Sequence, residues 1–229
     1  MTPYYLGNPK HFIAIDCIIF GFDEGELNIL LHKRKFEPEK NKWSLMGGFL
    51  QEDESIEAAA RRILEGCSGL KNLFMEQLFT FGDVHRDKGE RVISVAYFAL
   101  IRIEDFNKEL NKQTTAQWWP ISSRPALLFD HDEMVEKALK RLRIRSKNRP
   151  IGFELLPRKF TVPQLQSLYE AISQRKLDKR NFRKKILSMN LLQKLNEKDK
   201  QTSKKGAFFY QFDKRRYNRL VEKGFHFEL

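Results

Sequence analysis

Apolar residues follow two different spacings along the first two thirds of the chain. Helical spacing predicts helices over residues 55–67 and 130–142, the first with apolar Ile56, Ala60 and Ile63 on one face. A turn is predicted over 21–25. Mostly apolar runs, typical of strands, cover 12–20, 27–34, 75–84 and 91–103. The pattern indicates a mixed α+β domain.

The last third changes to helical spacing and then to a hairpin. Thr161 can cap a helix whose first turn contains Pro163, and Asp178 can cap a second helix. Residues 191–195 and 207–212 predict the arms of a hairpin with a polar, basic tip. The residues predicted to face inward from the two helices are Leu165, Leu168, Tyr169, Ile172, Phe182 and Ile186. This part is predicted to be a module of its own.

The charge distribution separates the same two parts. The chain has 229 residues and a formal net charge of +12, enough length for one core and a smaller second module. Residues 1–149 contain 23 Lys and Arg against 22 Asp and Glu, a net of +1, whereas residues 150–229 contain 19 against 8, a net of +11. Such asymmetry indicates a domain that opposes phosphate groups. The alternatives are a solvated basic tail and a ribosomal or membrane-surface patch.

Composition narrows the setting of the protein. The first dozen residues have no basic start followed by an apolar block, as a secretory leader would. No apolar run approaches the roughly 20 residues that span a bilayer. Cys17 and Cys67 give neither a disulfide framework nor metal-ligand spacing. We therefore expect a cytoplasmic protein without a membrane partner.

Residues 48–70 resemble the Nudix box, G-x5-E-x7-R-E-U-x-E-E-x-G-U, where U is a bulky apolar residue. The matching positions are Gly48, Glu54, Arg62, Leu64, Gly69 and Leu70. The resemblance, to a domain of the ADP-ribose pyrophosphatase type, extends over about residues 10–145 and includes 43–48 and 81–86. It implies an α/β/α sandwich around a mixed sheet.

The departures from the box concern the metal ligands. Enzymes of this family hold Mg²⁺ through box glutamates, because Mg²⁺ requires hard oxygen ligands. Ile63, Gly66 and Cys67 occupy those positions here, and none offers a side-chain oxygen. Glu65 is one residue before the glutamate position that Gly66 occupies, which is a rotation of about 100° around the helix. Its carboxylate is therefore predicted to point away from the metal site. We expect no metal, no cofactor and no catalytic residue, with Glu54 and Arg62 forming a structural ion pair.

An active enzyme is the alternative to that interpretation. Glu52, Asp53, Glu54 and Glu57 form a local acidic cluster, and some family members use ligands outside the box. This alternative predicts Mg²⁺-dependent hydrolysis of nucleoside diphosphate compounds of the ADP-ribose type.

Residues 157–229 resemble the winged helix-turn-helix of Nudix-related transcriptional regulators. The stretches 160–172 and 178–185 resemble its two helices, and 127–131 resembles a segment common to those regulators. The resemblance implies binding to double-stranded operator DNA, control by a small effector, and a homodimer on near-palindromic sites. Some members respond to ADP-ribose and others to L-arabinose. The chain most resembles the branch that controls sugar use in gut bacteria, which makes L-arabinose the expected effector and ADP-ribose the second choice.

The DNA-binding residues are predicted on the second helix and the hairpin tip. Arg180 and Asn181 lie near the helix start, where Arg can pair with guanine and Asn with adenine. The other cations are predicted to hold the phosphate backbone, and for each of them a solvated face is the alternative. The full predicted set is Lys179, Arg180, Asn181, Arg183, Lys184, Lys204 and Lys205.

The effector is predicted to occupy the former substrate cleft. A sugar needs planar polar groups and an aromatic platform, and the candidates are Asp16, Arg34, Trp43, Arg91 and Tyr5, with Tyr4 beside it. Core packing is the alternative for Trp43, and a satisfied buried carboxylate is the alternative for Asp16. His85 and His131 show no metal spacing and are predicted to be structural.

The domain organisation follows from these parts. We expect a sensing and dimerising domain over 1–145, a linker over 146–156 and a DNA-binding domain over 157–229. A ligand-responsive transcriptional regulator is the preferred function. A live hydrolase and a general nucleic-acid or RNA-associated protein are the alternatives.

Overall fold

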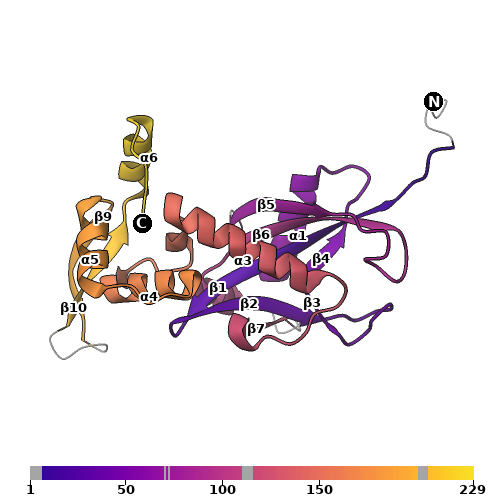
Figure 1. Cartoon of the computed structure of the whole chain (residues 1–229), viewed down its shortest axis with the longest axis horizontal. Coiled ribbons are helices and arrows are strands. Elements are labelled where there is room, and N and C mark those ends of the chain that lie inside the picture. The colour runs from indigo at the N-terminus through magenta and orange to yellow at the C-terminus, as the bar shows by residue number, and fades with distance from the viewer. Residues whose placement is uncertain (1–6, 70, 72, 110–115, 201–205) are drawn as a thin grey trace.

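A computed structural model describes residues 7–69, 71, 73–109, 116–200 and 206–229. The molecule is elongated, with a sheet domain at one end and a smaller helical domain at the other (Figure 1). The sheet domain contains β1 (Phe12–Asp23), β2 (Glu26–Lys33), β3 (Trp43–Ser44), β4 (Met46–Phe49), α1 (Ile56–Ser68), β5 (Phe74–Phe81), β6 (Val92–Leu100), α2 (Ile103–Glu109), β7 (Ala116–Pro120), the 3₁₀ helix η1 (Ile121–Ser123) and α3 (His131–Asn148). The smaller domain contains the 3₁₀ helix η2 (Ile151–Glu154), β8 (Phe160–Thr161), α4 (Val162–Ser173), α5 (Lys179–Ser188), β9 (Leu192–Asp199), β10 (Ala207–Phe212) and α6 (Lys214–Glu222).

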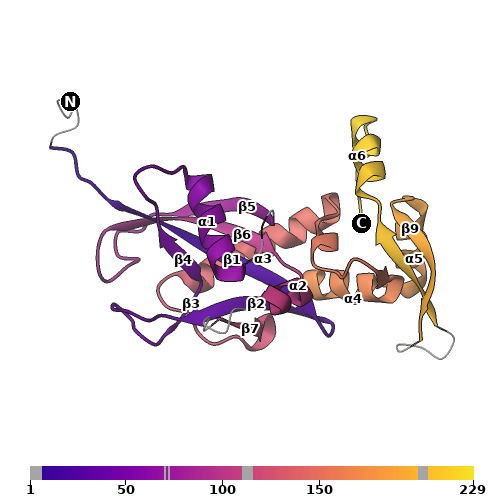
Figure 2. The same cartoon turned by 180° about the vertical axis from the view of Figure 1, so that it is seen from behind.

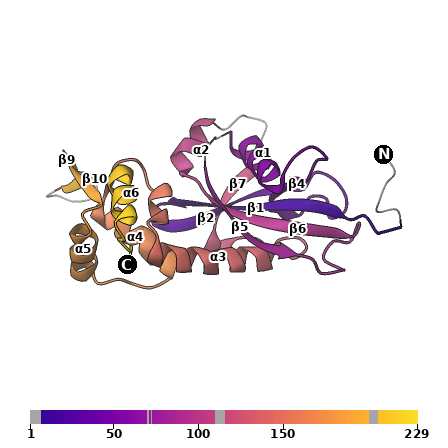
Figure 3. The ribbon, with the colours of Figure 1, turned by 90° about the horizontal axis from the view of Figure 1, so that it is seen from above.

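The large sheet is mixed and β1 lies at its centre. β1 pairs with β6 in parallel and with β2 and β4 in antiparallel fashion, and the strand order is β3-β2-β1-β6-β5 with β7 added to β2. Helices α1 and α2 cover one face and α3 covers the other, as Figure 3 shows from above. The expected α/β/α sandwich around a mixed sheet is confirmed.

Alternating residues of β1 feed two separate cores. Ile15 and Ile19 face α1 and α2, where Phe106 also packs. Ile18 and Phe20 face α3 on the other side. Because both faces of the strand are buried, β1 is a nearly continuous apolar run, as is usual for a central strand with helices on each side. The second core extends without interruption into the smaller domain.

Helix α1 confirms the helix predicted from the box. The Ser55 side chain caps it by accepting a hydrogen bond from the Ala58 backbone N–H at 3.1 Å. Gly69 ends it in the left-handed conformation, at φ 70°, which glycine adopts without a Cβ penalty.

The smaller domain contains helices α4, α5 and α6 and a three-stranded sheet in the order β8-β10-β9. A capping box starts α4, in which the Thr161 side chain accepts from the Gln164 N–H while the Gln164 side chain accepts from the Thr161 N–H. The Asp178 side chain caps α5 by accepting from the Asn181 N–H at 2.8 Å. All the residues predicted to face inward are buried, and the predicted winged helix-turn-helix is confirmed. Figure 2 shows this domain from behind.

The segment predicted as a linker is built into the fold. Helix α3 continues to Asn148, and Ile151, Phe153 and Leu156 are buried. The ring of Phe153 stacks on Phe212 with centroids 4.3 Å apart. The charged run 141–150 predicts an interdomain linker or an extension of the helix, and the structure shows the extension, followed by apolar residues that pack into the shared core. Helix α3 extends beyond the predicted end at residue 142, and Arg145 in this extension pairs with Glu76 on β5 at 2.9 Å.

Direct hydrogen bonds join the two domains. Arg102, at the start of α2, donates to the Leu156 carbonyl at 2.5 Å. Arg143 on α3 donates to the Ile172 carbonyl on α4 at 3.1 Å. The sheet domain and the smaller domain therefore share a core and a polar interface. No helix in the described part of the chain is both long and apolar enough to cross a membrane.

Candidate functional site

Two residues that match the Nudix box form the ion pair that the sequence predicts. Arg62 donates from Nε to Glu54 Oε2 at 2.9 Å and from Nη2 to the Phe49 carbonyl at 3.0 Å. Glu54 also accepts from the Gln51 backbone N–H at 2.9 Å. The hydrogen bond from Arg62 lowers the pKa of the Glu54 carboxyl group. Glu54 therefore links the loop before α1 to Arg62 on the helix.

The three former glutamate positions offer no ligand for Mg²⁺. Ile63 is buried and packs against Gly48, where an added Cβ would lie 3.3 Å from Ile63 Cδ1. Burial raises the pKa of the half-buried Cys67 thiol to about 11, so the thiol stays protonated at neutral pH. Gly66 and Glu65 are exposed. Among the described residues, no three His, Cys, Asp or Glu side chains gather as a metal site.

A buried carboxylate lies where the sheet meets α3. Asp16 on β1 is 7% exposed and accepts a hydrogen bond from Ser94 Oγ on the neighbouring β6 at 2.5 Å. Arg86 Nη2 and His131 Nε2 each lie 3.7 Å from its carboxylate oxygens. Gly47 on β4 approaches it so closely that a Cβ would lie 2.5 Å from Asp16 Oδ1. Only glycine allows this approach.

Arg86 connects Asp16 to the start of α3. Its side chain is 3% exposed and donates to both carboxylate oxygens of Asp130, at 2.8 and 2.7 Å. Burial acts to lower the pKa of Arg86, but the hydrogen bonds to Asp130 and the charges of Asp130, Asp16 and Asp87 together outweigh it and raise the pKa. Asp130 is the residue immediately before α3. The bidentate pair therefore ties the loop after β5 to the beginning of this helix.

His131 is held in its neutral form. Its Nδ1 accepts a hydrogen bond from the Leu45 backbone N–H at 3.2 Å, so the ring proton lies on Nε2, facing Asp16. Burial lowers the pKa of this ring. Burial also lowers the pKa of His32, whose Nε2 contacts the Leu45 carbonyl at 3.0 Å. His131 is structural, as predicted, and it also lines a cavity.

Two cavities meet at Arg86 and Phe129. The smaller, of about 120 Å³, is lined by Asp16, His131 and residues of β2 and β4. The larger, of about 670 Å³, lies between the end of β5, the loop before α3 and the first turns of α3. Phe79 and Phe81 line it, with the Lys137 ammonium 4.2 Å from the Phe79 ring centre.

The predicted effector residues divide into two groups. Asp16 and Arg34 line the smaller cavity, and the Arg34 guanidinium lies 4.2 Å from the Phe36 ring centre and 5.5 Å from that of Phe129. Trp43 instead packs edge-on against Trp119, with centroids 5.2 Å apart, and it lines neither cavity. The core-packing alternative fits Trp43.

Arg91 and Tyr5 are the other two members of the predicted effector set. Arg91 donates to the carbonyls of Gly82 and Asp83, both at 3.0 Å, and lines neither cavity. It holds the loop after β5 in place. Tyr5, like Tyr4, lies outside the described residues.

Sequence reasoning missed Arg86, Asp130 and Ser94 as members of this cluster. Ser94 gave one usable signal, since it is a polar residue inside the apolar strand 92–100. Its partner depends on the parallel register, which places Ala14 opposite Ser94 and so brings Ser94 beside Asp16. The pairing of Arg86 with Asp130 joins residues 44 positions apart, and no local pattern indicates it.

The exposed face of α5 is strongly basic. Phe182 and Ile186 are buried, and the rest of the predicted set on this helix is exposed to solvent. The exposed members are Lys179, Arg180, Asn181, Arg183 and Lys184. Lys204 and Lys205 lie outside the described residues.

Comparison with known proteins identifies both domains. The family described as "NUDIX domain" matches residues 10–141, and "NrtR DNA-binding winged helix domain" matches residues 152–212. The ADPR responsive transcriptional repressor NtrR of Acinetobacter baylyi is 29% identical over 228 residues, covering 96% of this chain and 91% of the relative.

Solved structures agree with both matches. The crystal structure of Shewanella oneidensis NrtR complexed with a 27mer DNA has a TM-score of 0.80 at 27% identity and covers 88% of this chain and 93% of that chain. The NUDIX domain of the same Shewanella protein, complexed with ADP ribose, has a TM-score of 0.51 at 29% identity and covers 59% of this chain and 90% of that chain. The chain therefore belongs to the NUDIX domain family and has an NrtR-type winged helix domain on its C-terminal side.

Proposed function

We propose that this protein is a transcriptional repressor that binds operator DNA through its winged helix domain and responds to ADP-ribose through a NUDIX domain that does not hydrolyse it. The observation that supports this most directly is the replacement of all three metal-holding glutamates by Ile63, Gly66 and Cys67 beside an intact cavity. Similarity over almost the whole chain to an ADPR responsive transcriptional repressor supports the same function.

The chemistry of the cavities suits a nucleoside diphosphate better than a small sugar. A cavity of about 670 Å³ is of the size that takes drug-sized ligands. Arg34 lines the adjoining cavity and has no carboxylate within 4.0 Å among the described residues, so its charge is available to a phosphate group. Phe36 and Phe129, which stack on Arg34, offer aromatic faces.

The L-arabinose effector expected from the sequence has no support from these comparisons. The Acinetobacter relative is described as ADPR responsive, and the NUDIX domain of Shewanella oneidensis NrtR was solved with ADP ribose, whereas the link to carbohydrate metabolism rested on the sugar alone. ADP-ribose therefore replaces L-arabinose as the proposed effector, and L-arabinose becomes the control ligand.

Helix α3 offers a route from the cavity to the DNA-binding domain. Its first residue, His131, lines the smaller cavity, and the preceding Asp130 lines the larger one. Near its other end Arg143 holds the Ile172 carbonyl on α4. A ligand that shifts the first turn of α3 would therefore move this 18-residue helix as a whole, including the end that contacts α4.

A homodimer completes the proposal. Helix-turn-helix proteins usually bind two half-sites as two-fold dimers. We expect a particle of twice the 27.2 kDa chain mass in light scattering, and an operator with two inverted half-sites.

A mobility-shift titration with DNA from upstream of the protein's own operon tests the function. We expect specific, salt-sensitive binding that ADP-ribose weakens and L-arabinose leaves unchanged. A matched assay follows ADP-ribose hydrolysis with Mg²⁺ present, and we expect no turnover. Turnover that is lost in Glu57→Gln, combined with no duplex binding, would instead establish the hydrolase. Equal binding to unrelated duplexes and RNA would establish a general nucleic-acid-binding protein.

A further inference from the structure

Helix α6 lies beyond the part of the chain that matches the winged helix family, which ends at residue 212. The Asp213 side chain starts it by accepting from the Arg216 N–H at 2.8 Å. Tyr217, Leu220 and the following Phe225 pack against the shared core. The helix is therefore anchored by one apolar face, and its opposite face is free.

The free face of α6 presents a row of cations. Arg215 and Arg219 on α6, and Lys223 immediately after its last residue, follow one another at four-residue intervals, which places them on one side of the helix about 6 Å apart. All three are exposed, and no carboxylate of the described residues lies within 4.0 Å of them. Like charges at this spacing repel one another, so a polyanion opposite the row would relieve the repulsion.

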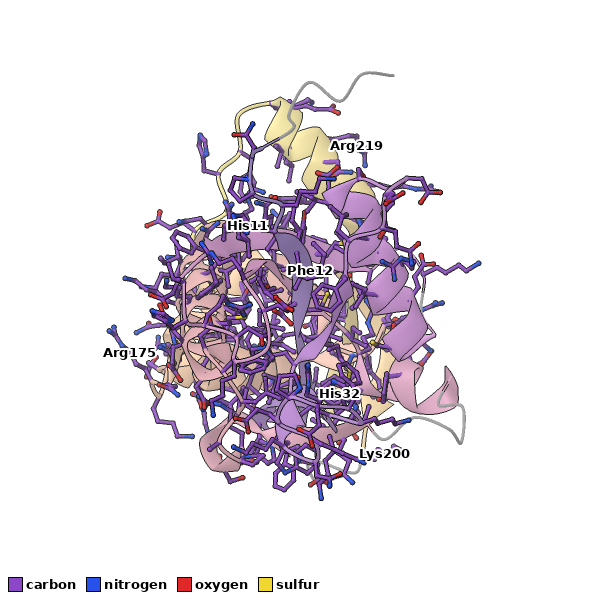
Figure 4. All side chains as sticks on the ribbon, turned by 90° about the vertical axis from the view of Figure 1, so that its right-hand side faces the viewer. His11, Phe12, His32, Arg175, Lys200 and Arg219 are labelled. Atoms are coloured by element: carbon purple, nitrogen blue, oxygen red, sulfur yellow. The ribbon has the colours of Figure 1, made fainter. Side chains whose placement is uncertain are left out.

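The position of α6 beside α5 favours DNA as the polyanion. In Figure 1, α5 lies at the end of the molecule with α6 on one side and the described ends of β9 and β10 on the other. Figure 4, a view along the long axis, places Arg219 and Lys200 at opposite edges. A duplex that α5 enters through the major groove continues to both sides of that helix. The row on α6 is then beside the duplex on the side away from the hairpin.

We propose that α6 is a second DNA-backbone-binding element, in which Arg215, Arg219 and Lys223 contact phosphates that flank the sequence contacted by α5. This inference rests on the proposed DNA-binding function. The contacts are electrostatic and independent of base sequence, because phosphates have no sequence information. A membrane surface fits less well, because Tyr217 and Leu220 of α6 are half-buried against the protein's own core.

The test compares two triple variants of the full-length protein. The first is Arg215→Gln/Arg219→Gln/Lys223→Gln. The second, Lys10→Gln/Lys40→Gln/Arg61→Gln, removes the same charge from exposed cations of the sheet domain. The affinity for the upstream duplex and for an unrelated duplex is measured over a range of salt concentrations. Thermal unfolding is recorded to confirm that both variants fold.

We expect the slope of log K against log salt to become shallower by about 2 to 3 in the α6 variant, since each phosphate contact contributes about 0.9. Affinity should fall about tenfold or more at low salt, equally for both duplexes. A slope change no larger than that of the sheet-domain variant would overturn the inference while leaving the proposed function intact. Absence of duplex binding by the unaltered protein would overturn the proposed function itself, and this inference with it.

Discussion

The cavity and the α5 face use the same charged residue types in opposite ways. Around the cavity Arg86 and Asp16 are buried, and each lies against partners from other elements. On α5 Arg180 and Arg183 are exposed, and no carboxylate of the described residues lies within 4.0 Å of them. A buried charge must be paired within the protein, whereas an exposed cation can be paired by another molecule. Pairing therefore distinguishes the charges that hold the fold from the charges available for binding.

The largest expected effect follows from breaking the buried cluster. Arg86→Met leaves Asp16 and Asp130 without their main cation, and removing one partner of a buried pair costs about 3–5 kcal/mol. We expect the free energy of unfolding in urea to fall by that amount. Arg61→Met, an exposed position on α1, is the control and should change it by less than about 0.5 kcal/mol. Equal stability of the two variants would mean that the cluster does not support the fold.

A smaller effect is expected at the DNA-binding end, and on binding rather than on stability. Arg180→Ala should cost about 1–3 kcal/mol of binding free energy and relax the preference for one base pair. Lys184→Ala, on the same helix, should weaken all duplexes alike and make the salt slope shallower by about 1. Competition between operator variants measures both. If the two variants behave identically across sequences, α5 does not recognise bases as proposed.

The features that sequence could predict are those set by short spacings. The caps Thr161 and Asp178 and the box residues Glu54 and Arg62 are separated from their partners by three to eight residues, and each pairing formed as predicted. The α/β/α sandwich followed from the same box and from the unbroken apolar run in β1.

The features that the sequence did not predict are of two kinds. Some depend on pairing between residues far apart in the chain, and others are helices whose few apolar residues lie among many charged ones. Asp16 meets Ser94 only through the parallel register of β1 and β6. Helix α6 has Tyr217 and Leu220 as its inward residues among four Lys and Arg, so its helical period was not recognised. The charged residues 141–149 left a linker and a helix extension as alternatives, and the structure shows that α3 continues to Asn148.

The cavity region also predicts a pH response of stability. Burial lowers the pKa of His131 in the folded protein, so the ring stays neutral there while the unfolded chain takes up a proton below its ordinary pKa of about 6.5. Stability is therefore unaffected above that pH and falls as the pH drops through it. The free energy of unfolding of the unaltered protein should fall more between pH 7.5 and 5.5 than that of His131→Gln. His226→Gln, an exposed histidine, is the control and should follow the unaltered protein. Parallel pH curves for His131→Gln and the unaltered protein would contradict the neutral assignment.

The smallest effect concerns a former metal position in α1. Gly66 is exposed in the helix, and no atom lies within 4 Å of the place where a Cβ would be added. A glycine in a helix is less stable than alanine by about 0.5–1 kcal/mol, so Gly66→Ala should raise the free energy of unfolding by that amount. In the proposed function Gly66 contacts neither a metal ion, nor DNA, nor the effector. The affinities for duplex DNA and for ADP-ribose should therefore stay unchanged. A gain in stability accompanied by weaker ADP-ribose binding would mean that the effector contacts α1. The two cavities that meet at Arg86 and Phe129 would then not form the complete effector site.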